Sequence, residues 1–409
     1  MIEFLKSSIF KKAFFRNSTY LFVGTLPLFL SINTIAIWIF VVSSFTVMSL
    51  KERKQILWKR RAFVLPFVLL FFLYVLGIFL STDTAVAIKN LTRVLTLLLL
   101  PTVILSHKKE DFNFKHIYYA LGAGLLIGMV ICWGFVISSI LTNATPLRQA
   151  PYFFEWIYSN WNLVKPIGIH PNYFALLIVL LVLAILKSEE LKFLKANKLK
   201  LVLILFPFFL FLFELSSRVA FLAFILALVF SVIQKRNIKK GILIGLFVVG
   251  VIILSLKFDY LGNKFTGLID GSGKVKIERI QRWDHIIREF KKEDKLMFGV
   301  GSGDTEEIYT RAYINGDFKT ALIENYNAHN QFLEFFVSNG FLGLIIFTWV
   351  ILFFAFKTRL KGEALSFFII IVLLSIIESF LSRAKGVFIF SFFLSFYLLM
   401  YSDKLIKNE

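Results

Sequence analysis

The chain has 409 residues, of which 58% are hydrophobic and 17% aromatic, including 50 phenylalanines. One soluble core cannot bury so many apolar side chains, so the composition excludes a soluble globular protein and predicts an integral membrane protein. The net charge of +20 does not indicate nucleic-acid binding, because the basic residues lie mostly in short connections between apolar runs. A single cysteine, Cys132, excludes an intrachain disulfide and a multi-cysteine metal site.

Apolar runs long enough to cross a bilayer, which takes roughly 20 residues, follow one another along most of the chain. The stretch 20–49 lies between two basic clusters that both favour the cytoplasm, so we interpret it as two tightly connected helices. Ten further runs bring the expected total to twelve spans within a single transmembrane domain, 1–409. These runs are 62–81, 91–106, 117–141, 171–187, 201–217, 219–234, 241–256, 331–356, 364–382 and 386–401.

The basic connections alternate along this arrangement and all fall on one face, which the positive-inside rule places in the cytoplasm. The loop 257–330, expected between spans nine and ten, holds 12 Lys plus Arg and 12 Asp plus Glu and falls on the opposite, periplasmic face. Lys89 and Arg93 fall on that face too, against the rule. The basic connections are 107–116, 187–200, 235–240 and 357–361, followed by the C-terminal tail.

The periplasmic loop contains candidate functional residues on a predicted helix. Arg279 and Arg282 lie three residues apart and can project together from it. The glycine-rich stretch 298–304 lacks the lysine of a nucleotide-binding loop, and we interpret it as a structural turn. The helix is predicted from four apolar residues at helical spacing, which form a face expected to pack on the membrane domain: Ile280, Trp283, Ile287 and Phe290.

Three arginines are expected at the outer membrane surface near one histidine, His329: Arg218, Arg282 and Arg383. A charged side chain at the centre of a transmembrane helix costs about 2.5–3.5 kcal/mol, so each arginine needs a charged partner or a functional role. Any one of them could extend to the interface or pair locally, but a guanidinium also fits phosphate oxygens and stays charged. Together they suit a lipid-linked pyrophosphate. No Asp-x-Asp pair stands out on the outer loops, so nothing in the sequence requires a metal.

Four segments carry motifs in a specific order and spacing. They are S-S-R-V-A-F-L-A-F at 216–224, R-W at 282–283 with G-V-G-S-G-D at 299–304, A-H-N-Q-F-L-E at 328–334 with G-F-L-G at 340–343, and E-S-F-L-S-R-A-K-G-V-F-I-F at 378–390. Together they resemble the O-antigen ligase and polymerase superfamily. The resemblance implies an all-α polytopic fold of about 12 transmembrane helices with a membrane-embedded glycosyltransferase (GT-C-like) architecture. It also implies a periplasm-facing active site in the bacterial inner membrane and no metal or cofactor.

The resemblance implies an undecaprenyl-pyrophosphate-linked glycan donor and, for a ligase, a lipid A core acceptor. By position it assigns Arg218, Arg282 and His329 to catalysis, with Arg279 as the rival of Arg282. The resulting hypothesis is an inverting transfer in which the arginines bind pyrophosphate and His329 takes a proton from the acceptor hydroxyl. Further candidates for substrate binding are Asn330, Glu334, Arg383, whose neighbour Lys385 does not match the family pattern, and His170, which could equally be a structural helix start.

Alternatives remain open at this point. An O-antigen polymerase or a protein O-oligosaccharyltransferase would use the same donor with another glycan or a protein as acceptor. A polysaccharide transporter or flippase belongs to a different class, and such proteins commonly show internal repeats with charges at mid-membrane. No convincing repeat is present, and the candidate charges gather at one face, so the sequence favours a glycosyltransferase that contacts membrane lipids.

Overall fold

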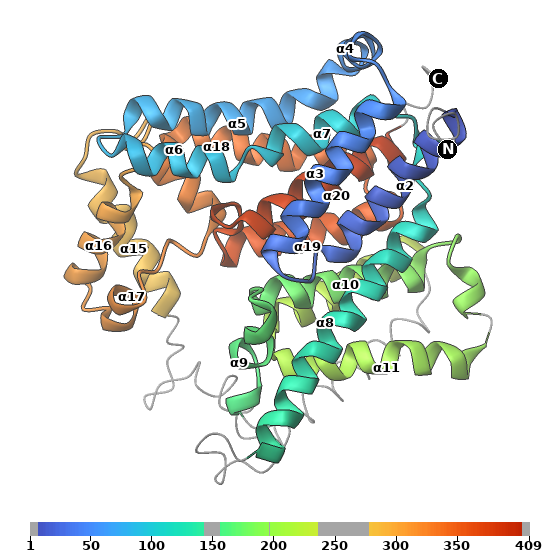
Figure 1. The fold of residues 1–409 in the computed structure, drawn as a ribbon. Coiled ribbons are helices and arrows are strands. Elements are labelled where there is room, and N and C mark those ends of the chain that lie inside the picture. The colour runs from blue at the N-terminus through green and yellow to red at the C-terminus, as the bar shows by residue number, and fades with distance from the viewer. Residues whose placement is uncertain (1–6, 143–155, 196, 236–277, 403–409) are drawn as a thin grey trace. The chain divides into compact units, whose positions relative to one another are not determined.

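The computed structural model describes residues 7–142, 156–195, 197–235 and 278–402, and all regular structure in these ranges is helical (Figure 1). Six of these helices are individually long and apolar enough to cross a membrane, and a bent pair of helices is a seventh candidate. An all-α membrane fold is therefore confirmed, whereas the total of twelve spans stays a prediction. The expected span 241–256 and the first part of the periplasmic loop, 257–277, lie outside the described residues.

The helices pack into two compact units, each drawn from several separate stretches of chain. Unit 1 takes residues from Met1–Ser49, Lys109–Gly267 and Leu365–Ile370. Unit 2 takes residues from Leu50–Lys108, Leu268–Ala364 and Ile371–Glu409. The main helices of unit 1 are α2 (Ser8–Thr25), α3 (Leu30–Val47), α8 (Phe114–Thr142), α9 (Trp161–Val164), α10 (Pro171–Lys187), α11 (Lys198–Leu215) and α12 (Arg218–Lys235). Those of unit 2 are α4 (Leu50–Lys59), α5 (Arg61–Leu80), α6 (Thr84–Arg93), α7 (Thr96–Ser106), α15 (Glu278–Lys291), α16 (Thr305–Asn315), α17 (Lys319–Ile323), α18 (Gln331–Thr358) and α20 (Ala384–Tyr401), while α19 (Glu363–Ile377) has residues in both.

The first two helices of unit 1 confirm the interpretation of 20–49 as a connected helix pair. The Asn33 amide donates to the Phe22 carbonyl and to the Thr25 hydroxyl, which fastens the turn between them. The first helix starts earlier than expected, at Ser8, because the Ser7 side chain accepts from the Phe10 N–H and caps it. Hydropathy alone missed this polar first half.

In unit 2 the segment 82–90, expected to be a loop, is largely the helix α6. The Asp83 carboxylate accepts from the Val86 N–H and caps its start, and after a break at residues 94 and 95 the chain continues as α7. The expected start of this span at 91 is therefore wrong by several residues. Lys89 and Arg93 lie four residues apart on α6, and so on one face of it.

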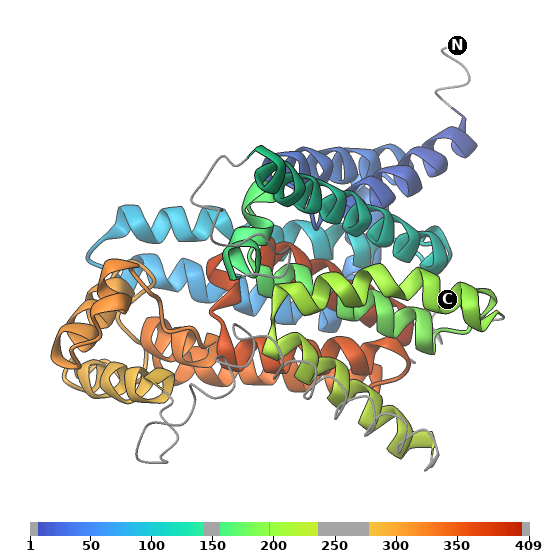
Figure 2. The ribbon, with the colours of Figure 1, turned by 90° about the horizontal axis from the view of Figure 1, so that it is seen from below.

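The described part of the loop 257–330 folds around a small hydrophobic core that joins α15, α16 and α17 to the start of α18. These three helices gather at the end of unit 2 where α5 ends and α18 begins (Figures 1 and 2). Ile286 and Phe290 are fully buried there, and Trp283 and Ile287 pack against them. Ile280 is 52% exposed, so the prediction that it belongs to the buried face of this helix is wrong. It lies in the first turn of α15, apart from the side chains of this core.

The glycine-rich stretch pairs with a break in α18, as expected of a structural turn. Gly340 interrupts the helix with φ +63° and ψ −155°. The N–H groups of Val300 and Gly301 donate to the Val337 and Ser338 carbonyls, and the Phe341 N–H donates to the Leu296 carbonyl. The backbone groups that the helix loses at its break are therefore satisfied by the loop.

The glycine-rich stretch 298–304 is also hydrogen-bonded to the turn between α5 and α6. The Asp304 carboxylate accepts from the Thr82 and Asp83 N–H groups at 2.8 and 2.9 Å. The Ser81 hydroxyl accepts from the Gly303 N–H, and the Asn90 amide donates to the Ser302 carbonyl. These contacts hold the loop against α6.

Replacing Gly340 by alanine should destabilise the protein by at least about 2 kcal/mol. The new Cβ would clash with the backbone of Leu296 and Met297, and a non-glycine residue is strained in this φ/ψ region. A Cβ there would lie 2.4 Å from the Leu296 carbonyl oxygen. Thermal unfolding of the purified protein in detergent measures the loss. Gly134→Ala is the matched control, because a Cβ on that glycine has open space around it. Equal unfolding temperatures for the two variants would contradict the assignment.

Candidate functional site

His329 lies at the end of the loop 257–330, directly before α18, and is paired with a buried carboxylate. Its Nδ1 is 3.0 Å from the Glu378 Oε2, which belongs to the turn between α19 and α20. The His329 backbone has φ +46°, a conformation uncommon outside glycine, and its N–H donates to the Asn327 side chain. If Nδ1 carries the proton shared with Glu378, Nε2 is left as the basic nitrogen.

An aromatic ring joins His329 to the loop arginine. The Tyr326 ring meets the imidazole edge to face at 4.9 Å between centroids, and the Arg282 guanidinium carbon lies 5.2 Å from the centre of the same ring. The Trp283 indole donates to the Ala328 carbonyl, which fixes α15 beside the histidine. Arg282 is 9% exposed. The structure therefore brings Arg282 and His329 together on two sides of one tyrosine.

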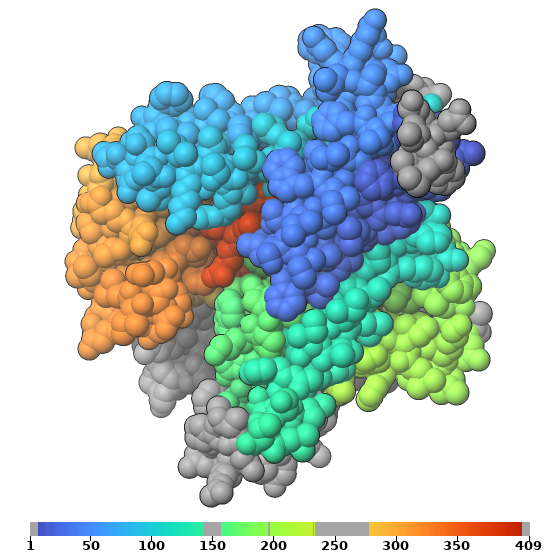
Figure 3. Space-filling view, in the orientation of Figure 1, coloured from blue at the N-terminus to red at the C-terminus, as the bar shows by residue number. Residues whose placement is uncertain are grey.

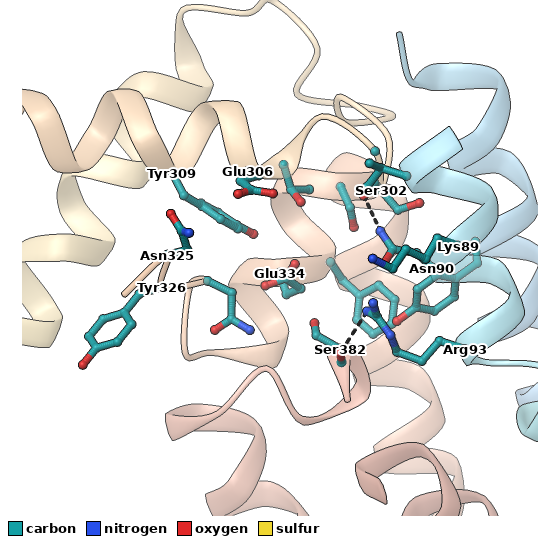
Figure 4. Close-up of a pocket in the computed structure, with 17 residues that line it drawn as sticks. Lys89, Asn90, Arg93, Ser302, Glu306, Tyr309, Asn325, Tyr326, Glu334 and Ser382 are labelled. Atoms are coloured by element: carbon teal, nitrogen blue, oxygen red, sulfur yellow. Dashed lines mark hydrogen bonds between the residues drawn. The ribbon is translucent and has the colours of Figure 1, made fainter. Parts of the chain in front are cut away.

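A cavity of about 380 Å³ opens beside this cluster (Figure 4). Lys89 and Arg93 of α6 line one wall, and Glu306 and Glu334, from α16 and α18, line the other. Arg93 donates to the Ser382 carbonyl at 2.9 Å, which anchors it to the turn before α20. The cavity thus offers cations on one side and carboxylates on the other.

Three polar atoms of the cavity wall are buried without a protein hydrogen-bond partner of normal geometry: the hydroxyls of Ser302 and Tyr309 and one oxygen of Glu334. Burial and the nearby negative charge of Glu334 raise the pKa of the Tyr309 phenol well above its ordinary value, so this group is protonated at neutral pH. Buried polar groups are normally satisfied. Their arrangement therefore fits a polar molecule in the cavity, such as a sugar.

Of the remaining candidates near the loop, one lines the cavity and the others do not. Glu334 lines the cavity, whereas Asn330 caps α18 with its side-chain oxygen, which accepts from the Phe332 and Leu333 N–H groups. Arg279 lies at the start of α15, one turn before Arg282, and is less buried. Arg383 is exposed, next to the cavity residue Ser382.

His170 and Arg218 belong to unit 1. The His170 ring caps α10 by accepting from the Asn172 N–H, and Trp161 packs against it. The Asn172 side chain in turn accepts from the Ser217 hydroxyl, directly before Arg218 at the exposed start of α12. A chain of contacts thus links the two candidates in unit 1, while the expected meeting of Arg218 with His329 stays a prediction.

Residues 201–348 match the family described as O-antigen ligase. Over this segment, which is about a third of the chain, the protein is similar to the O-antigen ligase family. Together with its apolar helices, this makes it a multi-pass membrane protein with a ligase-type or polymerase-type function. No curated protein matches the chain. The matched segment contains Arg218, Arg279, Arg282, His329, Asn330 and Glu334, whereas His170 and Arg383 lie outside it.

Two parts of the site escaped the sequence reasoning. Lys89 and Arg93 stood out only as breaking the positive-inside rule, which was a usable signal of a functional role. Glu378 was not singled out as a site residue, because its contact with His329 spans 49 residues. Within the parts of the chain that the structure describes, no three His, Cys, Asp or Glu side chains gather as they would to hold a metal ion.

Proposed function

We propose that this protein transfers a glycan from an undecaprenyl-pyrophosphate donor to a lipid A core acceptor at the periplasmic face of the bacterial inner membrane. The reaction is inverting and needs no metal. The observation that carries the proposal is the pair formed by His329 and buried Glu378, placed beside Arg282 and next to a cavity with a basic wall.

In this reaction an acceptor hydroxyl oxygen attacks the anomeric carbon of the donor sugar, and the bond from that carbon to the pyrophosphate oxygen breaks. His329 receives the hydroxyl proton on Nε2, while Glu378 holds the ring through Nδ1 and stabilises the imidazolium that forms. The electron pair of the broken bond leaves on undecaprenyl pyrophosphate. One general base with its orienting carboxylate therefore suffices for the proton transfer.

The leaving pyrophosphate gains negative charge, which nearby cations stabilise. Arg282 contacts the same Tyr326 ring as His329, and Lys89 and Arg93 extend the positive wall along the cavity. Arg218 of unit 1 would join them. Carboxylates and hydroxyls can hydrogen-bond sugar hydroxyls, so Glu306, Glu334, Ser302 and Tyr309 fit the glycan side.

The test is transfer in vitro by the purified protein, with a fluorescent undecaprenyl-pyrophosphate glycan as donor and purified lipid A core as acceptor. We expect a lipid A-linked product in equal amount with and without EDTA. Elongation of the lipid-linked glycan, with no transfer to lipid A core, would identify a polymerase instead. Transfer only to protein would identify an oligosaccharyltransferase, and loss of product in EDTA would contradict the metal-independent mechanism.

Replacing Lys89 by glutamine should lower kcat/KM about tenfold, mostly through a higher KM for the donor, because one charge-assisted contact to pyrophosphate is lost. Lys319→Gln is the control, since Lys319 is an exposed lysine on α17 that does not line the cavity. Initial rates at varied donor concentration give both constants. An unchanged KM in Lys89→Gln would remove this lysine from the donor site.

A further inference from the structure

The short helix α4 is fixed to the end of α7 by two buried arginines, one on α4 and one directly after it. Arg53 donates to the Ser106 hydroxyl at 2.5 Å. Arg60 donates to the carbonyls of Leu105 and His107 at 2.8 and 2.6 Å. Since α7 ends at Ser106, the Arg60 guanidinium satisfies carbonyls at the end of this helix, and both guanidinium groups lie at the negative end of its dipole. Helix α4 is therefore a rigid element, and the side chains on its other face keep a defined arrangement.

That other face forms a groove of about 620 Å³ with the first turns of α5. Lys54 and Arg61 are exposed within it, and the Arg61 guanidinium lies 5.1 Å from the centre of the Trp58 ring. Trp58 is 69% exposed, and the helix lies at the surface (Figure 3). Among the residues that the structure describes, no acidic side chain lines the groove. Its lining is Arg53, Lys54 and Arg61 together with Leu50, Leu57, Trp58, Val64, Leu65 and Val68.

The groove and the cavity of the candidate site lie toward opposite ends of α5. The groove occupies the end that begins at Arg61, and the other end meets the loop through Ser81 and Thr82. A helix of 20 residues is about 30 Å long, which is the thickness of the bilayer hydrocarbon core. If the cavity faces the periplasm, the groove is at the level of the cytoplasmic leaflet, where anionic headgroups attract basic segments.

We propose that this groove binds one anionic phospholipid of the cytoplasmic leaflet. The lipid phosphate lies between Lys54 and Arg61, and an acyl chain lies along Leu57, Val64 and Val68. Charge complementarity favours this occupant, because every charged group of the groove is a cation. The apolar wall favours a lipid over a soluble phosphate, since a soluble anion would leave that wall and Trp58 unused. Tryptophan with basic residues is the usual anchor at a membrane interface.

Native mass spectrometry of the full-length protein, released from mixed micelles of dioleoyl phosphatidylglycerol and dioleoyl phosphatidylcholine, tests the site. The wild type should retain one phosphatidylglycerol in preference to phosphatidylcholine. In the double variant K54Q/R61Q retention should fall about tenfold, because each basic residue near an anionic lipid contributes several-fold in affinity. Size-exclusion profiles should match that of the wild type, since both side chains are exposed.

The matched control is K51Q/K59Q, which removes the same charge from exposed positions of α4 outside the groove. It should retain phosphatidylglycerol as the wild type does. Equal losses in both double variants would mean that diffuse surface charge attracts the lipid, and the proposal would be overturned. No loss in K54Q/R61Q, or equal retention of the two lipids by the wild type, would overturn it as well.

Discussion

Replacing His329 by asparagine should lower the rate of glycan transfer by about 10²–10⁴-fold, the contribution of a positioned general base. The asparagine side chain has no basic nitrogen to replace Nε2. Asparagine tolerates positive φ better than alanine, so it suits the backbone at +46° and should leave the fold intact. Initial rates with the lipid-linked donor and lipid A core measure the loss, and His329→Ala should give a similar value.

The control is His285→Asn, a histidine of α15 that packs against Phe318, away from the cavity. Its activity should stay within a few-fold of wild type. Glu378→Gln tests the positioning carboxylate: kcat should fall at least tenfold with little change in KM, because the substrate contacts remain while the ring loses its charged partner. Near-normal turnover in His329→Asn would refute the proposed base.

Hydropathy placed the helices of this protein well because burial in lipid is a local property of about 20 consecutive side chains. Each expected span within the described residues coincides with a helix to within several residues, except that the first helix begins at Ser8 and not near residue 20. The errors lie where a single polar contact sets the boundary, as at Ser7 and Asp83, whose side chains start helices in polar sequence. The break at Gly340 was not foreseen either, because a distant loop supplies its hydrogen bonds.

In the candidate site, too, residues in local motifs could be predicted from the sequence, whereas contacts between distant segments could not. His329 and Arg282 could be named from their motifs, but the contact of His329 with Glu378 depends on how α18 packs against the turn before α20. From the sequence, Lys89 only broke the positive-inside rule. The structure shows that α6 lies next to the loop, because the Asn90 side chain donates to the Ser302 carbonyl. A charge that breaks a topology rule is thus better interpreted as a candidate ligand-binding group than as an exception.

The choice between the two loop arginines can now be tested, since they differ in surroundings on the same helix. Arg282 is buried over the Tyr326 ring, next to His329, whereas Arg279 lies one turn earlier and is more exposed. Arg282→Met should therefore reduce transfer by about 10²–10³-fold, as expected when a cation that stabilises developing charge is removed. Methionine keeps much of the side-chain volume and limits the loss of packing.

Arg279→Met is the matched control and should cost no more than a few-fold. Arg282→Lys should recover part of the activity, because lysine restores the charge without the planar fork that binds two phosphate oxygens. Unfolding temperatures of the purified variants separate lost charge from lost packing. If Arg279→Met were the more damaging change in a folded protein, the pyrophosphate would contact the first turn of α15, and the cluster around Tyr326 would be a structural support for His329 alone.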